Sequence, residues 1–128
     1  MAKVICSVDP RGRPLVRMQS NGDDLLLVVD TGFNGDLMVT RRAASVLGVD
    51  AQSDEADVEL GDGTTARLLE GATTIDWLDE KRRVRVFIAD AWATVADGPD
   101  GLLGTNLLSP HLLLIDFAAR TVEIETVD

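Results

Sequence analysis

Short segments rich in apolar and β-branched residues alternate with clusters of Gly, Pro, Asn and Asp along most of the chain. Such segments, bounded by turn formers, are typical of β-strands. The predicted strands are Lys3–Val8, Leu15–Ser20, Leu25–Val29, Leu37–Val39, Val58–Leu60, Thr65–Leu69, Thr73–Leu78, Val84–Ala89, Trp92–Val95, Leu112–Ile115 and Thr121–Thr126. Many short strands with closely spaced turns predict an all-β fold, a closed sheet or barrel.

One segment, Arg41–Leu47, has the composition and apolar spacing of a helix of about two turns. Thr40 can cap its first turn, and Gly48 follows as a C-terminal stop. Thr105–Leu108 is long enough only for a helical turn. The expected fold is therefore a closed β-barrel with one short helix, formed by a single domain over residues 1–128.

Three turn signals arrange the strands into hairpins. Asn21-Gly22 is a strong signal for a two-residue hairpin turn. Gly61-Asp62-Gly63 forms the glycine-rich tip of a second hairpin, and Asp79-Glu80-Lys81 the charged turn of a third. The first hairpin delivers the end of its second arm at Asp30.

The end of that arm is the most informative stretch of the sequence. Five apolar residues, Leu25–Val29, run into Asp30-Thr31-Gly32. A carboxylate at the end of a buried strand is costly unless something holds it, so Asp30 is a candidate for chemistry. The same tripeptide is also an ordinary turn sequence, because Asp and Thr bond their own backbone and Gly accepts positive φ. A simple turn cap therefore remains an open interpretation.

Composition narrows the classes of partner. The 128 residues are 45% hydrophobic and carry a net charge of −10, which argues against nucleic acid or an anionic membrane as a partner and also simply favours solubility. Cys6 is the only cysteine, so no internal disulfide can form and a reducing, cytoplasmic compartment is expected. No long apolar run is present, so neither a signal peptide nor a membrane span is predicted.

Neither a metal site nor a cofactor is predicted. His111 is the only histidine, and its place beside Pro110 predicts a loop or surface residue. Cys6 lies in a predicted strand with no histidine near it in sequence, so a small buried apolar side chain is the simpler interpretation.

Three features in a fixed order resemble the retropepsin-like aspartic proteases of clan AA. They are the apolar strand ending in Asp30-Thr31-Gly32, the hairpin tipped by Gly61-Asp62-Gly63, and Leu102-Leu103-Gly104 followed by Thr105-Asn106-Leu107-Leu108. Members of this family are single-domain chains that act as homodimers on polypeptide substrates, without a cofactor. With Phe33 after the glycine, the motif resembles a less familiar Asp-Thr-Gly-Phe subgroup.

The resemblance implies a role for each matching residue. Asp30 would be catalytic, with one copy from each subunit. Thr31 would hydrogen-bond across the dimer axis, and Gly32 would let the loop lie close to its twin and to substrate. Leu102, Leu103 and Gly104 would support this loop from behind. The substrate-binding flap would span residues 60–66, with Gly61, Asp62, Gly63 and Thr64 at its tip.

The sequence departs from the family pattern at several positions. Phe33 replaces the usual Ala or Ser, so it either narrows the cleft or packs in the core. Retroviral members pair an Asp just beyond the loop with an Arg before the late Asn-Leu-Leu. Asn34 and Thr105 stand at these two places, so both charges are absent together. The flap tip carries the charged Asp62 where the family often has an apolar residue.

The chemistry implied by the resemblance is amide hydrolysis by a pair of carboxylates. Two such groups a few ångströms apart cannot both ionise cheaply, so they share one proton. One then accepts a proton from water while the other polarises the carbonyl. Because the chain contains one Asp-Thr-Gly, this requires two chains. Two alternatives stay open: a non-catalytic dimerisation or peptide-binding module on the same fold, and an unrelated small barrel in which Asp30 caps a turn.

Overall fold

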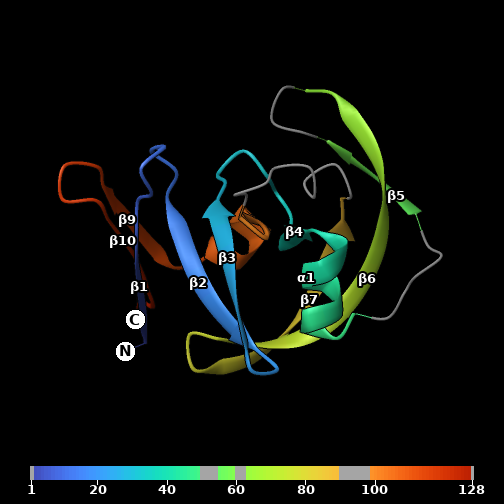
Figure 1. The fold of residues 1–128 in the computed structure, drawn as a ribbon, viewed down its shortest axis with the longest axis horizontal. Coiled ribbons are helices and arrows are strands. Elements are labelled where there is room, and N and C mark those ends of the chain that lie inside the picture. The colour runs from blue at the N-terminus through green and yellow to red at the C-terminus, as the bar shows by residue number, and fades with distance from the viewer. Residues whose placement is uncertain (1, 50–54, 60–62, 90–98, 128) are drawn as a thin grey trace.

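The computed structural model describes residues 2–49, 55–59, 63–89 and 99–127, which form mainly β-structure with two short helices (Figure 1). The strands are β1 (Lys3–Ser7), β2 (Leu15–Ser20), β3 (Asp23–Val29), β4 (Leu37–Val39), β5 (Glu55–Glu59), β6 (Thr65–Trp77), β7 (Glu80–Ile88), β8 (Gly101–Leu103), β9 (Leu112–Asp116) and β10 (Thr121–Glu125). The helices are α1 (Arg41–Leu47) and α2 (Thr105–Leu108).

The strands form two separate sheets. One has three strands in the order β1-β10-β9, and the other has seven in the order β2-β3-β8-β4-β7-β6-β5. The expectation of a closed barrel is wrong for the described chain, because β2 and β5 remain edges of the larger sheet. The physical reason is that β1 pairs along its length with β10 and so does not extend the larger sheet.

Local signals placed the first hairpin and the first helix correctly. Asn21 and Gly22 have φ angles of 51° and 84°, as a two-residue hairpin turn requires. Thr40 accepts a hydrogen bond of 3.1 Å from the Ala43 N–H at the start of α1, and Gly48 ends the helix in the left-handed conformation. Neither helix in the described residues is long and apolar enough to span a membrane.

The third predicted hairpin differs from the structure in two ways. Thr65–Leu69 and Thr73–Leu78 were expected as separate strands, but β6 continues from Thr65 to Trp77 because Gly71 pairs with Val86 on β7 and keeps the ladder intact. The turn lies at Leu78 and Asp79, which have φ angles of 51° and 66°. The predicted strand at residues 92–95 lies outside the described residues.

Strand β8 threads between two strands that are distant from it in sequence. It runs parallel to β3 and antiparallel to β4. A Cβ atom on Gly101 would lie 2.2 Å from the Met38 carbonyl oxygen and 2.8 Å from the Val39 Cα. Because both neighbours are backbone atoms, only glycine allows β8 to approach β4 this closely.

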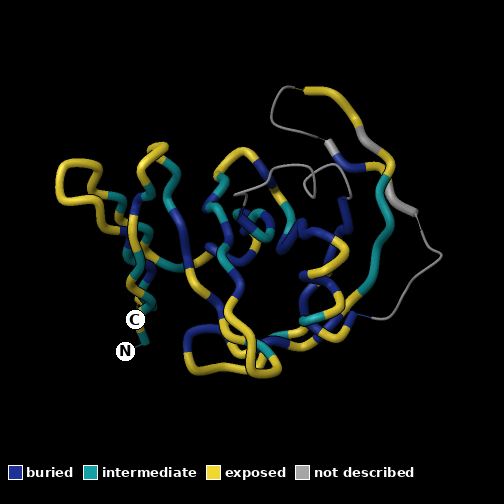
Figure 2. Tube along the Cα trace, in the orientation of Figure 1, coloured by how far each residue is buried: buried dark blue, intermediate teal, exposed yellow. Residues whose placement is uncertain are grey.

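The larger sheet has an apolar cluster on each face, as the alternation of side chains along a strand dictates. The main core takes Leu37 and Val39 of β4, whereas Met38 between them joins the second cluster. The second cluster consists of Phe33, Met38, Val58, Phe87 and Ala89. Buried segments concentrate in the middle of the molecule, and many of the connecting turns are exposed (Figure 2).

We predict that Gly101→Ala destabilises the protein by about 3 kcal/mol, because the added methyl group meets backbone that cannot move aside. Gly12→Ala is the matched control. Its Cβ meets nothing within 4 Å, and its positive φ alone should cost about 1 kcal/mol. Urea denaturation measures both differences. Equal losses for the two variants would show that the close approach of β8 is not what glycine provides.

Candidate active site

Asp30 directly follows β3 and is fixed by its own loop and by β8. Its backbone N–H donates to the Leu103 carbonyl over 3.0 Å, which continues the parallel pairing of β3 with β8. Its carboxylate Oδ1 accepts a hydrogen bond of 2.8 Å from the Gly32 N–H. The Asp30 carbonyl accepts one of 3.2 Å from the Phe33 N–H, which closes the turn.

The tip of this loop faces solvent in the single chain. Asp30 is half-buried, whereas Thr31 and Gly32 are exposed. Among the described residues, no hydrogen bond reaches the second carboxylate oxygen of Asp30, Oδ2. The loop therefore presents a carboxylate with one oxygen held by backbone and the other available to water or to another chain.

The leucine-leucine-glycine segment lies directly beside this loop. Leu103 is fully buried and pairs with Val29, and Leu102 is half-buried against the second cluster. A Cβ on Gly104 would lie 2.2 Å from the Gly35 carbonyl oxygen, so the loop and the segment are in backbone contact. The Gly104 N–H also donates to the Asp36 carbonyl over 2.9 Å. The structure thus brings the two motifs together, while their roles remain a proposal.

Asn34 and Thr105, which stand where retroviral members carry an ion pair, face each other. The Thr105 hydroxyl lies 3.4 Å from the Asn34 Oδ1, and the Thr105 N–H donates to the Phe33 carbonyl over 2.8 Å. A neutral contact and a backbone hydrogen bond therefore join the loop to α2 without any charge.

Phe33 is a buried residue that also borders a cavity. It is 4% exposed, and its ring meets that of Phe87 edge-on, with centroids 6.2 Å apart and planes inclined by 66°. Gly35 makes room for this ring, because a Cβ there would lie 2.6 Å from it. The interpretation of Phe33 as a core residue is confirmed, because the side chain packs in the second cluster. The ring also borders a cavity, while its effect on a substrate cleft stays a prediction.

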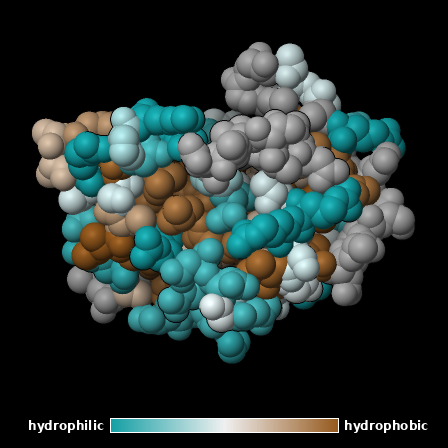
Figure 3. All heavy atoms as spheres, viewed as in Figure 1, coloured by the Kyte–Doolittle hydropathy of each residue, from teal (hydrophilic) through white to brown (hydrophobic). Residues whose placement is uncertain are grey.

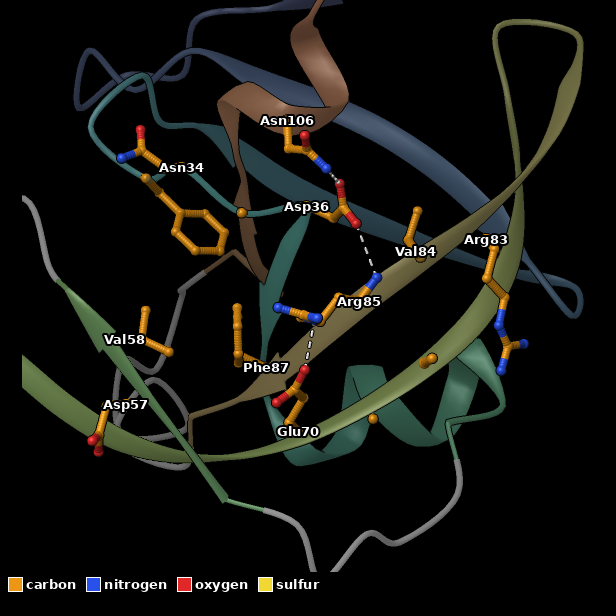
Figure 4. Close-up of a pocket in the computed structure, with 14 residues that line it drawn as sticks. Asn34, Asp36, Asp57, Val58, Glu70, Arg83, Val84, Arg85, Phe87 and Asn106 are labelled. Carbon is orange, nitrogen blue, oxygen red and sulfur yellow. Dashed lines mark hydrogen bonds and ion pairs between the residues drawn. The ribbon is translucent and has the colours of Figure 1, made fainter.

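A cavity of about 1030 Å³ opens on this second face of the larger sheet. The loop Phe33–Asp36, the strands β5, β6 and β7, and Asn106 of α2 surround it (Figure 4). Its lining residues are Phe33, Asn34, Gly35, Asp36, Asp57, Val58, Glu70, Gly71, Ala72, Arg83, Val84, Arg85, Phe87 and Asn106. Asp30 is not among them, so the cavity begins beside the candidate catalytic loop rather than at its carboxylate.

Asp36 is a member of this site that the sequence interpretation missed. Its side chain is buried, and it accepts hydrogen bonds from the Asn106 side-chain amide at 2.6 Å and from the Arg85 N–H at 2.9 Å (Figure 4). These contacts tie the loop to α2 and to β7. An acid placed immediately before the buried strand Leu37–Val39 was the signal that could have drawn attention to it.

The predicted flap corresponds to the hairpin formed by β5 and β6. The two strands pair as far as Glu59 and Thr65. Gly63 has a φ angle of 86°, and both Gly63 and Thr64 are exposed. Gly61 and Asp62 lie outside the described residues. Val58 and Asp57 of β5 line the cavity, so this hairpin forms one of its walls.

His111 lies outside the cavity, in the bend before β9. It is half-buried, and its N–H donates to the Leu108 carbonyl over 2.7 Å. Burial lowers the pKa of its imidazole, and the nearby charge of Arg82 adds to this, partly opposed by Glu80. Among the described residues, no group of three or more His, Cys, Asp and Glu side chains is arranged to hold a metal ion.

The fold is similar to that of a retropepsin-like aspartic protease from Rickettsia conorii, known from its crystal structure. The TM-score is 0.62 at 17% sequence identity, covering 95% of this chain and 89% of that chain. No known protein-family profile and no characterised protein sequence matches this chain. At this identity the likeness shows the fold alone, so the chain has the retropepsin-like fold, and its placement in the Asp-Thr-Gly-Phe subgroup stays a prediction.

We predict that Phe33→Ala lowers the free energy of unfolding by about 3 to 5 kcal/mol, because it empties the centre of the second cluster. Phe117→Ala removes the same ring from a turn where it is 62% exposed, and should change stability by less than about 0.5 kcal/mol. Chemical denaturation of both variants measures the contrast. A small loss at Phe33 would mean that the ring serves the cavity and not the core.

Proposed function

We propose that this protein is an aspartic endopeptidase that acts as a homodimer, with Asp30 of each subunit forming the catalytic pair. The observation that carries the proposal is the Asp30 loop itself. Its carboxylate is oriented by the Gly32 N–H at 2.8 Å and its tip is exposed, on a retropepsin-like fold. No metal and no cofactor enters the proposed chemistry.

The proposed reaction needs only the two carboxyl groups and water. When two Asp30 side chains meet, they hold one proton between them, because two adjacent negative charges repel. The ionised group takes a proton from a water molecule, which attacks the carbonyl carbon that the protonated group polarises. Collapse of the tetrahedral intermediate then transfers a proton to the departing amine. The Gly32 N–H keeps the carboxylate in one orientation during these steps.

A second copy of the chain is needed to supply the second carboxyl group. The terminal sheet offers a surface that suits such a contact, because Ile5 of β1 and Leu112 and Leu114 of β9 are exposed on it. Phe117 and Val127, also exposed, lie just beyond its strands. Apolar residues at the molecular surface are visible over this end of the molecule (Figure 3). Glu123 and Glu125 of β10 lie between β1 and β9 and pair with Lys3, so the face combines apolar and charged side chains, as many protein interfaces do.

We predict that Asp30→Asn abolishes cleavage of a mixed peptide library while leaving the protein as stable at neutral pH as wild type, or more so. Asparagine retains the acceptor for the Gly32 N–H and removes the repulsion between the paired charges. Asp24→Asn on β3 is the control, because it removes one exposed charge from the same hairpin and should keep the activity. If the Asp30→Asn protein melts well below wild type, Asp30 is a structural cap and the proposal loses its basis.

We also predict that the wild-type protein sediments as a dimer at micromolar concentration. Leu114→Glu places a charge on the exposed apolar surface of the terminal sheet and should shift the equilibrium towards the monomer by at least tenfold. Activity should fall in parallel, since one chain carries one Asp30. Thr74→Glu, on an exposed position of β6, serves as the control of equal charge. A fully active monomer would contradict the shared catalytic pair.

A further inference from the structure

Asp36 is a buried carboxylate that forms no ion pair with any described residue. It is 7% exposed, and both of its hydrogen-bond donors, the Asn106 amide and the Arg85 backbone N–H, are neutral. The Arg85 guanidinium pairs instead with Glu70 at 2.6 Å. No ion pair reaches Asp36 from the described residues. Neutral donors satisfy the hydrogen bonding of this carboxylate and do not compensate its charge, so a cation that entered the cavity would find a favourable partner in Asp36.

The charges around the cavity favour a cation over an anion. The lining includes Asp36, Asp57 and Glu70 as acids and Arg83 and Arg85 as bases. Glu70 and Arg85 offset each other, and Asp57 and Arg83 are both exposed. The Arg83 side chain points away from Asp36, so Asp36 is the buried charge that remains (Figure 4). The whole chain has a net charge of −10, which raises the encounter rate with basic polypeptides.

Part of the cavity lining is apolar and suits the stem of a long side chain. Phe33, Val58 and Phe87 form it, and all three belong to the second cluster. Lys and Arg both bury an aliphatic stem against apolar surface while their charged end seeks a polar partner. The lining of this cavity of about 1030 Å³ therefore contains both an apolar surface and a carboxylate, the two features that such a side chain needs.

The cavity begins within the turn that contains the candidate catalytic residue. The Phe33 N–H donates to the Asp30 carbonyl, so the wall of the cavity is part of the same turn as the candidate catalytic residue. A polypeptide with its cleaved bond at Asp30 would carry a neighbouring residue past Phe33.

We propose that the cavity is a specificity site that takes a Lys or Arg side chain of the polypeptide substrate, with the charge at Asp36 and the stem against Phe33, Val58 and Phe87. This inference rests on the proposed function, because it assigns the substrate class of that site. It adds a preference for basic residues that the Asp-Thr-Gly loop does not itself specify.

The test is peptide binding to the Asp30→Asn protein, which separates recognition from cleavage. A library of decapeptides is made in matched pairs, each with Lys or with its uncharged analogue norleucine at one central position. We expect the best Lys peptides to bind about tenfold tighter than their norleucine partners. Equal binding within all pairs, or no binding by any Lys peptide, overturns the proposal.

Two substitutions on β6 locate the effect. Ala72 is exposed and lines the cavity, so Ala72→Lys should place a competing cation there and remove most of the tenfold preference. Thr74 is exposed two residues further along the same strand and does not line the cavity, so Thr74→Lys should leave the preference intact. An unchanged preference in Ala72→Lys would show that the basic residue binds elsewhere and would overturn the assignment.

A third variant addresses Asp36 directly. Asp36→Asn should abolish the preference for Lys over norleucine, and its folding is checked by thermal melting because it also alters the hydrogen bond from Arg85. Cleavage of the same peptide pairs by the wild-type protein is measured as well, so that the proposed peptidase activity and the proposed specificity site are tested separately. Lys-selective binding without cleavage would support the specificity site and count against the peptidase. Cleavage of Lys and norleucine peptides at equal rates would support the peptidase and count against the specificity site.

Discussion

The insertion of β8 between β3 and β4 is the constraint on which the rest of the structure depends. It requires glycine at Gly101, where backbone of β4 leaves no room for a Cβ, and again at Gly104, where the loop after β3 comes equally close. The Leu103 carbonyl of β8 accepts a hydrogen bond from the Asp30 backbone N–H and so fixes the backbone at Asp30. The position of the candidate catalytic carboxylate is therefore set by a strand that follows it by about seventy residues in sequence.

The two faces of the larger sheet differ in how completely they are covered. The face carrying Leu37, Val39, Val84 and Val86 is closed by the main core and supplies most of the buried apolar surface. The other face carries a smaller cluster around Phe33, and next to it the cavity remains open. Because side chains alternate along each strand, the same strands stabilise the fold on one side and border a cavity on the other.

Asp30 and Asp36 differ in how far along the sequence their hydrogen-bond donors lie. The Gly32 N–H, two residues away, orients Asp30. Asp36 is bound by Asn106 and by the backbone of Arg85, seventy and forty-nine residues away. Neutral donors hold both acids in the described chain, so neither carboxylate has its negative charge compensated by a described ion pair. The neutral contact between Asn34 and Thr105 fits the same arrangement, since it joins loop and helix without adding a charge.

The sequence by itself determined the features whose interactions span only a few residues. The Asn21-Gly22 turn, the capped helix α1 and the Asp-Thr-Gly loop all depend on backbone angles and hydrogen bonds within one or two turns of chain, so residue type suffices to indicate them. Only the tertiary structure decided that the larger sheet stays open and that β6 runs unbroken through Gly71. It also decided that Asp36 is buried next to a cavity, with no ion pair to any described residue. Each of these depends on which distant strand or side chain becomes the partner, and strand pairing across the chain is chosen by the packing of the whole core.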